Sequence, residues 1–210
     1  MTIALFGGTG RTGRLFLDRA LDAGHSIRLL ARTPSAVHRT TERITVVHGD
    51  VLDPDPVRNT VAGADVVVSL FGHVKGSPPR LQTRGTRHIV DAMRTEGVGR
   101  IISLSGGGLP FPDEDRPKIA DRLIRLAMRV VVPNVLHDAI EHADVLRASG
   151  VDWVIARAPR LTDDARTGDH RVGWVGVDSG MSIARGDLAD FILRLTEDTS
   201  FDGKMPFVSG

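Results

Sequence analysis

A glycine-rich segment near the N-terminus has the spacing of a phosphate-binding turn. It follows an apolar run over residues 2–6, and a helical pattern begins at about Thr12. Its glycines fit both Gly8-x-Gly10-x-x-Gly13 and Gly7-x-x-Gly10-x-x-Gly13. Glycine permits positive φ angles and close approach by a pyrophosphate, while a helix N-terminus supplies free N–H groups and a positive dipole end. The segment therefore predicts a dinucleotide site, with a purely structural turn as the alternative. The expected cofactor contacts here are Gly7, Thr9, Gly10, Arg11, Thr12 and Gly13.

The residue that follows the second expected strand indicates which dinucleotide would bind. Arg32 stands after the apolar run 26–31, where an acidic residue would hydrogen-bond the ribose 2′-hydroxyl of NAD. A guanidinium matches a 2′-phosphate in bidentate geometry, and Arg11 could add a second cation. We therefore predict NADP(H) in preference to NAD, the alternative being that Arg32 only faces water.

Residues after the later strands form the rest of the predicted site, because parallel strands end at the same edge of a sheet. Asp50 could accept a hydrogen bond from the adenine amino group, with Val51 against the ring, or it could cap the helix that begins at Pro54. Further expected cofactor contacts are Leu70, Phe71, Gly72, Ser105, Ala158 and Pro159.

Alternating apolar runs and helical patterns predict the fold. The expected strands are residues 2–6, 26–31, 44–48, 65–70, 100–104 and 152–156, with short strands near 172–175 and 207–208. The expected helices are residues 12–23, 34–39, 54–61, 81–96, 117–132, 136–149 and 188–196, the last with Asp187 as its N-cap. Six alternations predict an α/β, doubly wound parallel sheet of Rossmann type, with residues 1–210 as a single domain.

Composition limits the classes of function. The net charge of +1 indicates neither a nucleic-acid nor a membrane partner, so we expect a small-molecule substrate. The chain has no cysteine, which excludes disulfides and thiolate chemistry, and it has no tyrosine. Without a leader or a long apolar run, we expect a cytoplasmic monomer or homodimer.

Several segments, taken in order, resemble one known family. They are GGTGRTG, LLARTP, VVHGDVLD, VAGADVVVSLFG, GVGRIISLS and HADVLRASGVDWVIARAP. Together they resemble the atypical short-chain dehydrogenase/reductases of the NmrA-like group, and most of all its flavin reductase/biliverdin-IX-beta reductase branch. The resemblance covers nearly the whole chain. It implies an NADPH-binding reductase whose acceptor is a planar ring system, such as a flavin, stacked on the nicotinamide.

The chain also departs from that family. Ordinary short-chain dehydrogenases use a Tyr–Lys pair as the general acid, and this chain has no tyrosine. The flavin reductase branch has a serine at the position of Gly106, so a hydroxyl role falls to Ser105 or is absent. His137 could donate a proton, but it could equally be a surface residue of an amphipathic helix. His137 and Glu141 share a helix face without a third ligand, so we predict no metal site.

Two long loops, 71–80 and 106–116, could act as a lid and supply walls of the substrate pocket, the alternative being that they are plain connecting loops. The candidate wall residues are Phe71, His73, Leu109, Phe111 and Trp174. The favoured hypothesis is an NADPH-dependent oxidoreductase, because hydride transfer to a flavin needs proximity more than an acid. The alternative is a non-catalytic NADP(H)-binding redox sensor of the NmrA kind.

Overall fold

The computed structural model describes residues 1–210 and is built around one large sheet. Its strands are β1 (Thr2–Phe6), β2 (Ser26–Ala31), β3 (Ile44–His48), β4 (Val66–Ser69), β5 (Arg100–Gly106), β6 (Asp152–Ala158), β8 (Arg171–Gly173) and β10 (Phe207–Ser209). They lie in the order β3-β2-β1-β4-β5-β6-β10-β8, and only the β10–β8 pair is antiparallel. The order reverses between β1 and β4, which confirms the predicted doubly wound sheet. A separate parallel pair consists of β7 (Arg160–Thr162) and β9 (Ser182–Ala184).

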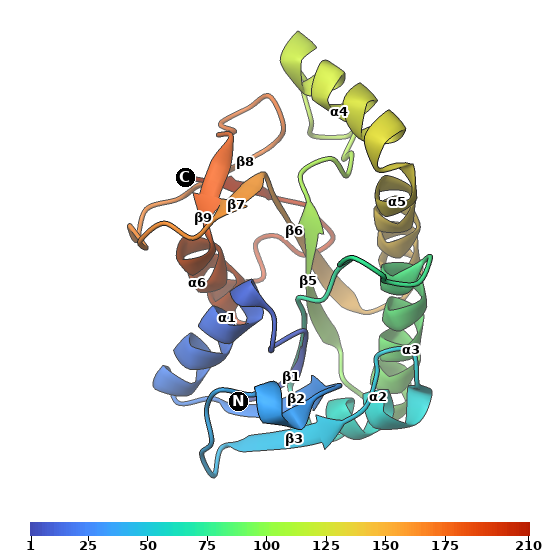
Figure 1. Ribbon diagram of the computed structural model, residues 1–210, viewed down its shortest axis with the longest axis vertical. Coiled ribbons are helices and arrows are strands. Elements are labelled where there is room, and N and C mark those ends of the chain that lie inside the picture. The colour runs from blue at the N-terminus through green and yellow to red at the C-terminus, as the bar shows by residue number, and fades with distance from the viewer.

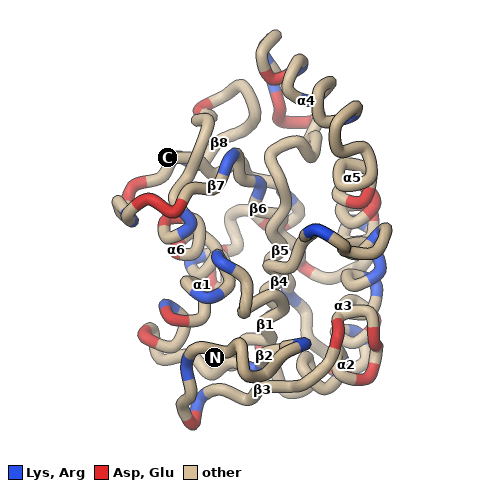
Figure 2. Tube along the Cα trace, in the orientation of Figure 1, with Lys and Arg blue, Asp and Glu red and all other residues tan.

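Helices cover both faces of this sheet (Figure 1). One face carries α1 (Arg11–Asp22) and α6 (Arg185–Leu195), and the other carries α2 (Pro54–Val61), α3 (Leu81–Glu96) and α5 (Pro133–Arg147). The remaining helix, α4 (Ile119–Val131), extends beyond the end of the sheet. Basic and acidic residues are interspersed along the trace in Figure 2.

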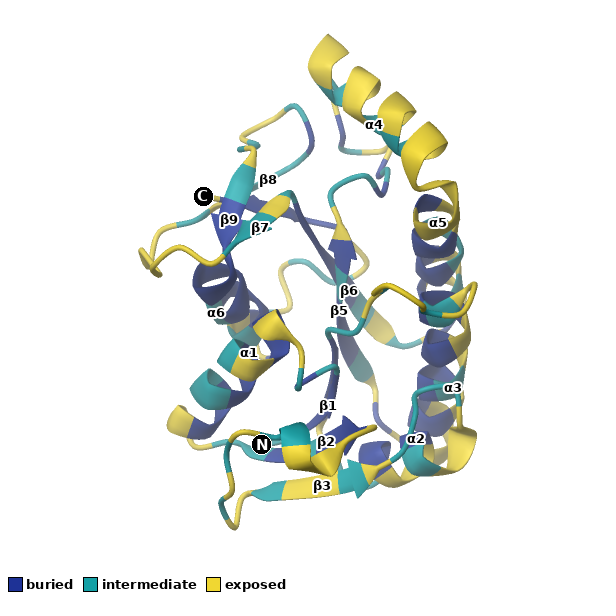
Figure 3. Cartoon of the chain, in the orientation of Figure 1, coloured by how far each residue is buried: buried dark blue, intermediate teal, exposed yellow.

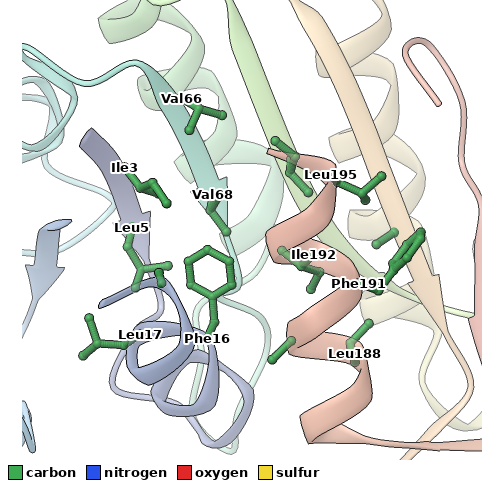
Figure 4. Close-up of a cluster of buried hydrophobic side chains, with 14 of the residues drawn as sticks. Ile3, Leu5, Phe16, Leu17, Val66, Val68, Leu188, Phe191, Ile192 and Leu195 are labelled. Atoms are coloured by element: carbon green, nitrogen blue, oxygen red, sulfur yellow. The ribbon is translucent and has the colours of Figure 1, made fainter. Parts of the chain in front are cut away.

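The core has two parts, one on each face of the sheet. Alternate residues of β1 point to opposite faces, so Ile3 and Leu5 belong to the α1–α6 side while Ala4 and Phe6 belong to the α2–α3–α5 side. Figure 4 shows Phe16 of α1 gathered with the apolar side chains of β1 and β4. Full burial of a side chain of this size contributes roughly 1.5–3 kcal/mol. The continuous apolar strands thus explain why both faces are covered.

One apolar stripe of the chain lies outside this core. The helix α4 has no buried residue, and it is almost entirely exposed in Figure 3. Its stripe of Ile119, Leu123, Leu126 and Val130 has side chains that are between 57% and 77% exposed. The sequence correctly predicts a helix with an apolar face here, but the face points to solvent.

Several predicted boundaries are wrong. Residues 34–39 form only a short 3₁₀ turn, Pro34–Ala36. Pro133 both follows α4 and begins α5, because a proline is well tolerated at the first helical position. Asp187 is not an N-cap: α6 begins at Arg185, and the Asp187 carboxylate instead accepts hydrogen bonds from the backbone N–H groups of residues 167 and 168.

Candidate functional site

Two glycines of the turn between β1 and α1, Gly7 and Gly13, have no room for a side chain. Gly7 has a φ of +84°, and a Cβ placed on it would lie 2.5 Å from the backbone nitrogen of Phe71. A Cβ on Gly13 would lie 2.1 Å from the Gly7 carbonyl oxygen. The helix therefore packs directly against the end of β1. Its N-cap, Gly10, offers no side-chain acceptor, and its first turn has no acidic residue, so the N–H groups and the positive dipole end remain available to an anion.

A cavity of about 300 Å³ lies next to this turn, at the carboxyl ends of β1–β4. We call it the glycine-turn cavity. Nine of the predicted cofactor contacts line it, namely Gly7, Thr9, Gly10, Arg32, Asp50, Val51, Leu70, Phe71 and Gly72. The other members of the predicted turn lie beside it: Arg11 is exposed and pairs with Asp163 at 3.1 Å, whereas Thr12 and Gly13 are buried at the start of α1. The fold thus brings nine predicted residues, from the glycine turn and from the ends of β2, β3 and β4, to one cavity.

The cationic side chain of Arg32 stands at the rim of the cavity. It is 73% exposed, and its Nε lies 3.9 Å from an Asp50 carboxylate oxygen. That carboxylate accepts a hydrogen bond from the Leu52 N–H at 2.9 Å. The helix α2 is capped by Asp53, which accepts from Asp55 N, so the alternative of Asp50 as the helix cap is wrong.

A second cavity, of about 570 Å³, lies beyond the ends of β5 and β6. We call it the α4 cavity, because α4 forms one of its walls. Its lining residues are Gly106, Gly107, Gly108, Lys118, Ala120, Asp121, Ile124, Arg125, Met128, Ala158, Pro159, Arg160, Val175, Ser179, Gly180, Met181 and Phe207. The volume lies within the range of small-molecule sites. The predicted contacts Ala158 and Pro159 therefore lie in this cavity and not in the glycine-turn cavity.

Ser105 lies near the end of β5 and lines neither of the two cavities. It is 5% exposed, and its Oγ has no hydrogen-bond partner in the protein. A buried hydroxyl without a partner costs roughly 1–3 kcal/mol, and such groups are few in folded proteins. The orphaned Oγ therefore fits a group that meets a bound ligand at this edge of the sheet.

His137 and the predicted aromatic walls are placed differently from the expectation. The His137 side chain is 71% exposed, pairs with Glu141 at 3.6 Å and lines neither cavity. Leu109 and Phe111 are buried, and Phe111 packs on Trp174 with ring centroids 5.7 Å apart. These three apolar residues line neither of the two cavities, whereas Phe71 and His73 line the glycine-turn cavity.

A buried ion pair that sequence reasoning missed holds the loop 106–116 in place. Arg157 of β6 is fully buried and donates two hydrogen bonds of 2.8 Å to the Asp115 carboxylate. Burial would raise the pKa of Asp115, but the hydrogen bonds from Arg157 and from the N–H groups of Phe111 and Val175 lower it. The ionised carboxylate thus ties the loop to β6 and to the segment around Val175, which borders the α4 cavity.

A buried histidine, also missed, links α3, α5 and β5. His142 Nδ1 lies 2.9 Å from Thr86 Oγ1, and its Nε2 lies 3.1 Å from Ser103 Oγ. Burial lowers the pKa of His142 to about 4, with the charge of Asp138 opposing that effect. His142 is therefore neutral at pH 7 and has a structural position.

The fold, with a cavity where the strand order reverses, defines a class, the Rossmann-like proteins, which bind ligands at the switch point of a parallel sheet. Residues 7–199 match the NAD(P)H-binding family, and the chain belongs to that family. No helix has the length and apolar character needed to cross a bilayer.

Relatives with assigned names include two reductases. Reductase pytE from Aspergillus terreus is 29% identical over an alignment covering 92% of this chain and 90% of that protein. The 3-diazoavenalumate denitrifying reductase of a Streptomyces species is 32% identical over 139 residues. The alignment covers 58% of this chain and 45% of the relative. The chain therefore spans under half of that relative's length.

Solved structures show the same fold at low identity. The anaerobillin reductase ChuY from Escherichia coli superposes with a TM-score of 0.81 at 19% identity, over 100% of this chain and 97% of that one. A short-chain dehydrogenase/reductase from Veillonella parvula in complex with NADP superposes with a TM-score of 0.80 at 19% identity, over 100% and 94% of the two chains. These similarities extend over the complete sheet and its helices.

Proposed function

We propose that the chain is an NADPH-dependent reductase that transfers hydride to a planar acceptor, such as a flavin, in the α4 cavity. The observation that carries the proposal is the pair of cavities along one edge of the sheet. One adjoins the glycine turn, and the other adjoins the ends of β5 and β6. Bound NADPH would supply the hydride.

The chain's own residues would bind and orient the two partners. The glycine turn and the start of α1 would hold the pyrophosphate, and Arg32 would contact the 2′-phosphate. Ser105, Ala158 and Pro159 would meet the nicotinamide end. The wall formed by Ile124, Met128 and Phe207 would hold an apolar ring face and exclude water. Correct placement is the main contribution, since hydride transfer between stacked rings depends on proximity.

The names of the relatives favour reduction over other chemistry. Two curated relatives and one structural neighbour are called reductases, and another neighbour was solved with NADP. The absence of tyrosine makes a carbonyl reduction that depends on a phenol acid impossible in this chain. An acceptor that takes hydride without such an acid, as a flavin does, fits better.

The test is an assay that follows the decrease of NADPH absorbance when FMN, FAD, riboflavin, quinones or bilins are supplied as acceptors. We expect turnover with at least one of them. Failure with every flavin, quinone and bilin would reject the proposal.

A non-catalytic redox sensor is the second candidate, favoured by the exposed position of His137 and the missing tyrosine. Tight NADP(H) binding without consumption of NADPH, together with a protein partner recovered in a pull-down, would favour that sensor.

A further inference from the structure

A histidine–aspartate pair stands at the wall of the glycine-turn cavity. His73 belongs to the loop after β4, lines the cavity and has a side chain that is 15% exposed. Its Nε2 lies 2.6 Å from an oxygen of the Asp138 carboxylate, which comes from α5. The two residues are brought together by the fold from positions 65 apart in the chain.

The Asp138 carboxylate is a firmly held hydrogen-bond acceptor. Its side chain is fully buried and accepts from Gln82 N at 2.8 Å and Thr83 N at 2.9 Å, as well as from the Thr83 hydroxyl. These N–H groups belong to the first turn of α3, whose own N-cap residue, Arg80, provides no side-chain bond. Burial would raise the pKa of Asp138, but the hydrogen bonds from Thr83, Gln82 and His73 lower it, so the group is ionised.

An ionised carboxylate at Nε2 determines how the imidazole can be used. The nitrogen facing Asp138 carries the proton and donates it, so in the neutral ring Nδ1 is an acceptor. Nδ1 has no partner in the protein and is not among the buried unpartnered atoms, so it is open to solvent, in a residue that lines the cavity. A carboxylate that holds one histidine nitrogen so that the other can act on a ligand is a recurrent arrangement at functional sites.

Other charged groups around the pair are already engaged. Glu141 of α5 accepts from Arg80 Nε at 2.6 Å and also faces His137. The ring of His142 is bonded to the side chains of α3 and β5 and does not reach His73. The only charged group bonded to His73 is therefore Asp138.

We propose that His73 is a ligand-binding residue of the glycine-turn cavity, that its Nδ1 accepts a hydrogen bond from a ribose hydroxyl of the bound dinucleotide, and that Asp138 is its positioning residue. The inference rests on the dinucleotide part of the proposed function and not on any acceptor. A neutral nitrogen acceptor suits a hydroxyl donor and not a phosphate. The cavity also extends from the glycine turn to the loop 71–80, so a dinucleotide at the turn would bring a ribose along this wall.

Two amide substitutions of His73 distinguish the roles of its two ring nitrogens. In His73→Gln the amide reaches the place of Nε2, keeping the bond to Asp138 but removing the group at Nδ1. In His73→Asn the amide occupies the place of Nδ1, and the bond to Asp138 is lost. NADPH affinity is measured by fluorescence titration, and folding is monitored by Tm.

We expect His73→Gln to weaken NADPH binding about 10-fold, as for the loss of one hydrogen bond, with an unchanged Tm. His73→Asn should bind within about 3-fold of the wild type, since the acceptor is retained. The reverse order of affinities, or unchanged affinity in both variants, would overturn the proposal and leave His73 as a structural partner of Asp138.

A second ligand identifies which ribose is involved. The fragment 2′,5′-ADP contains only the adenosine half, so weakening of its binding by His73→Gln would assign the adenosine ribose. Weakening seen with NADPH alone would assign the nicotinamide ribose. If wild-type protein fails to bind NADPH, both this proposal and the cofactor assignment are rejected. Binding without reduction of any acceptor rejects the reductase alone.

Discussion

At the scale of single residues, Arg32 is the side chain that we propose to distinguish NADP from NAD. Its guanidinium stands at the rim of the glycine-turn cavity and has only a distant partner in Asp50, at 3.9 Å. We expect Arg32→Ala to weaken NADP⁺ binding by about 1.5–3 kcal/mol, the size of a charged hydrogen bond. Binding of NAD⁺, which has no 2′-phosphate, should not change.

Isothermal titration calorimetry with both nucleotides measures this difference. The matched control is Arg43→Ala, because Arg43 is exposed at the amino end of β3, away from the cavity. An NADP⁺ affinity that is unchanged in Arg32→Ala would show that Arg32 does not contact the 2′-phosphate.

His142 makes stability depend on pH. Its pKa is lowered by burial to about 4, whereas an unfolded histidine titrates near 6.5. The neutral ring therefore contributes stability that is complete above pH 6.5 and is lost as the pH falls towards 4. The loss over this window is about 3 kcal/mol for a shift of this size.

Urea unfolding between pH 7 and pH 4 should show a flatter pH dependence in His142→Gln than in the wild type. The pKa values of His25 and His170 are also lowered, mainly by burial, so some dependence should persist in the variant. His48→Gln, at an exposed position of β3, is the control. Equal slopes for wild type and His142→Gln would mean that His142 does not account for the acid sensitivity.

At the scale of elements, the glycine turn couples the packing of α1 to the cavity. A Cβ at Gly13 would lie 2.1 Å from the Gly7 carbonyl oxygen and 2.7 Å from Gly8 Cα, both backbone atoms. Gly13→Ala should therefore displace α1, lower the unfolding free energy by about 1–3 kcal/mol and abolish NADPH binding.

Gly99→Ala is a matched control, because no atom lies within 4 Å of a Cβ built at that position. Thermal unfolding and NADPH fluorescence measure both effects. Wild-type binding and stability in Gly13→Ala would contradict the close packing described for the turn.

The helices and strands that could be predicted are those determined by the local pattern of apolar residues. The run Val66-Val67-Val68 is continuously apolar, as is typical of a strand covered on both faces, and β4 lies in the middle of the sheet. Because parallel strands end at one edge, the residues after β1 to β4 could be assigned to one cavity from the sequence. The less predictable boundaries follow from tertiary contacts, as at Asp187, whose partners lie some 20 residues earlier in the chain.

At the scale of the whole molecule, the polar networks could not be predicted from the sequence. Arg157 and Asp115 lie 42 positions apart, and His73 and Asp138 lie 65 apart. In the sequence, nothing distinguishes each of these residues from an ordinary charged residue at the surface. Only the folded chain brings the partners together. The same limit applies to His73: the sequence predicts it only as a wall residue, because its partner Asp138 is distant in the chain.

The exposed helix α4 has a consequence for the exchange of amide hydrogens with solvent. Opening α4 breaks its own hydrogen bonds, but the helix contributes no buried side chain of its own, so the opening needs little free energy. In deuterium-exchange mass spectrometry, the α4 amides should exchange well before those of α3, which has eight buried residues. A molecule held in the α4 cavity would contact Ile124 and Met128 and slow this exchange. Deuterium uptake in α4 would then report acceptor binding even where no turnover occurs, whereas protection equal to that of α3 in the free protein would contradict this view of the helix.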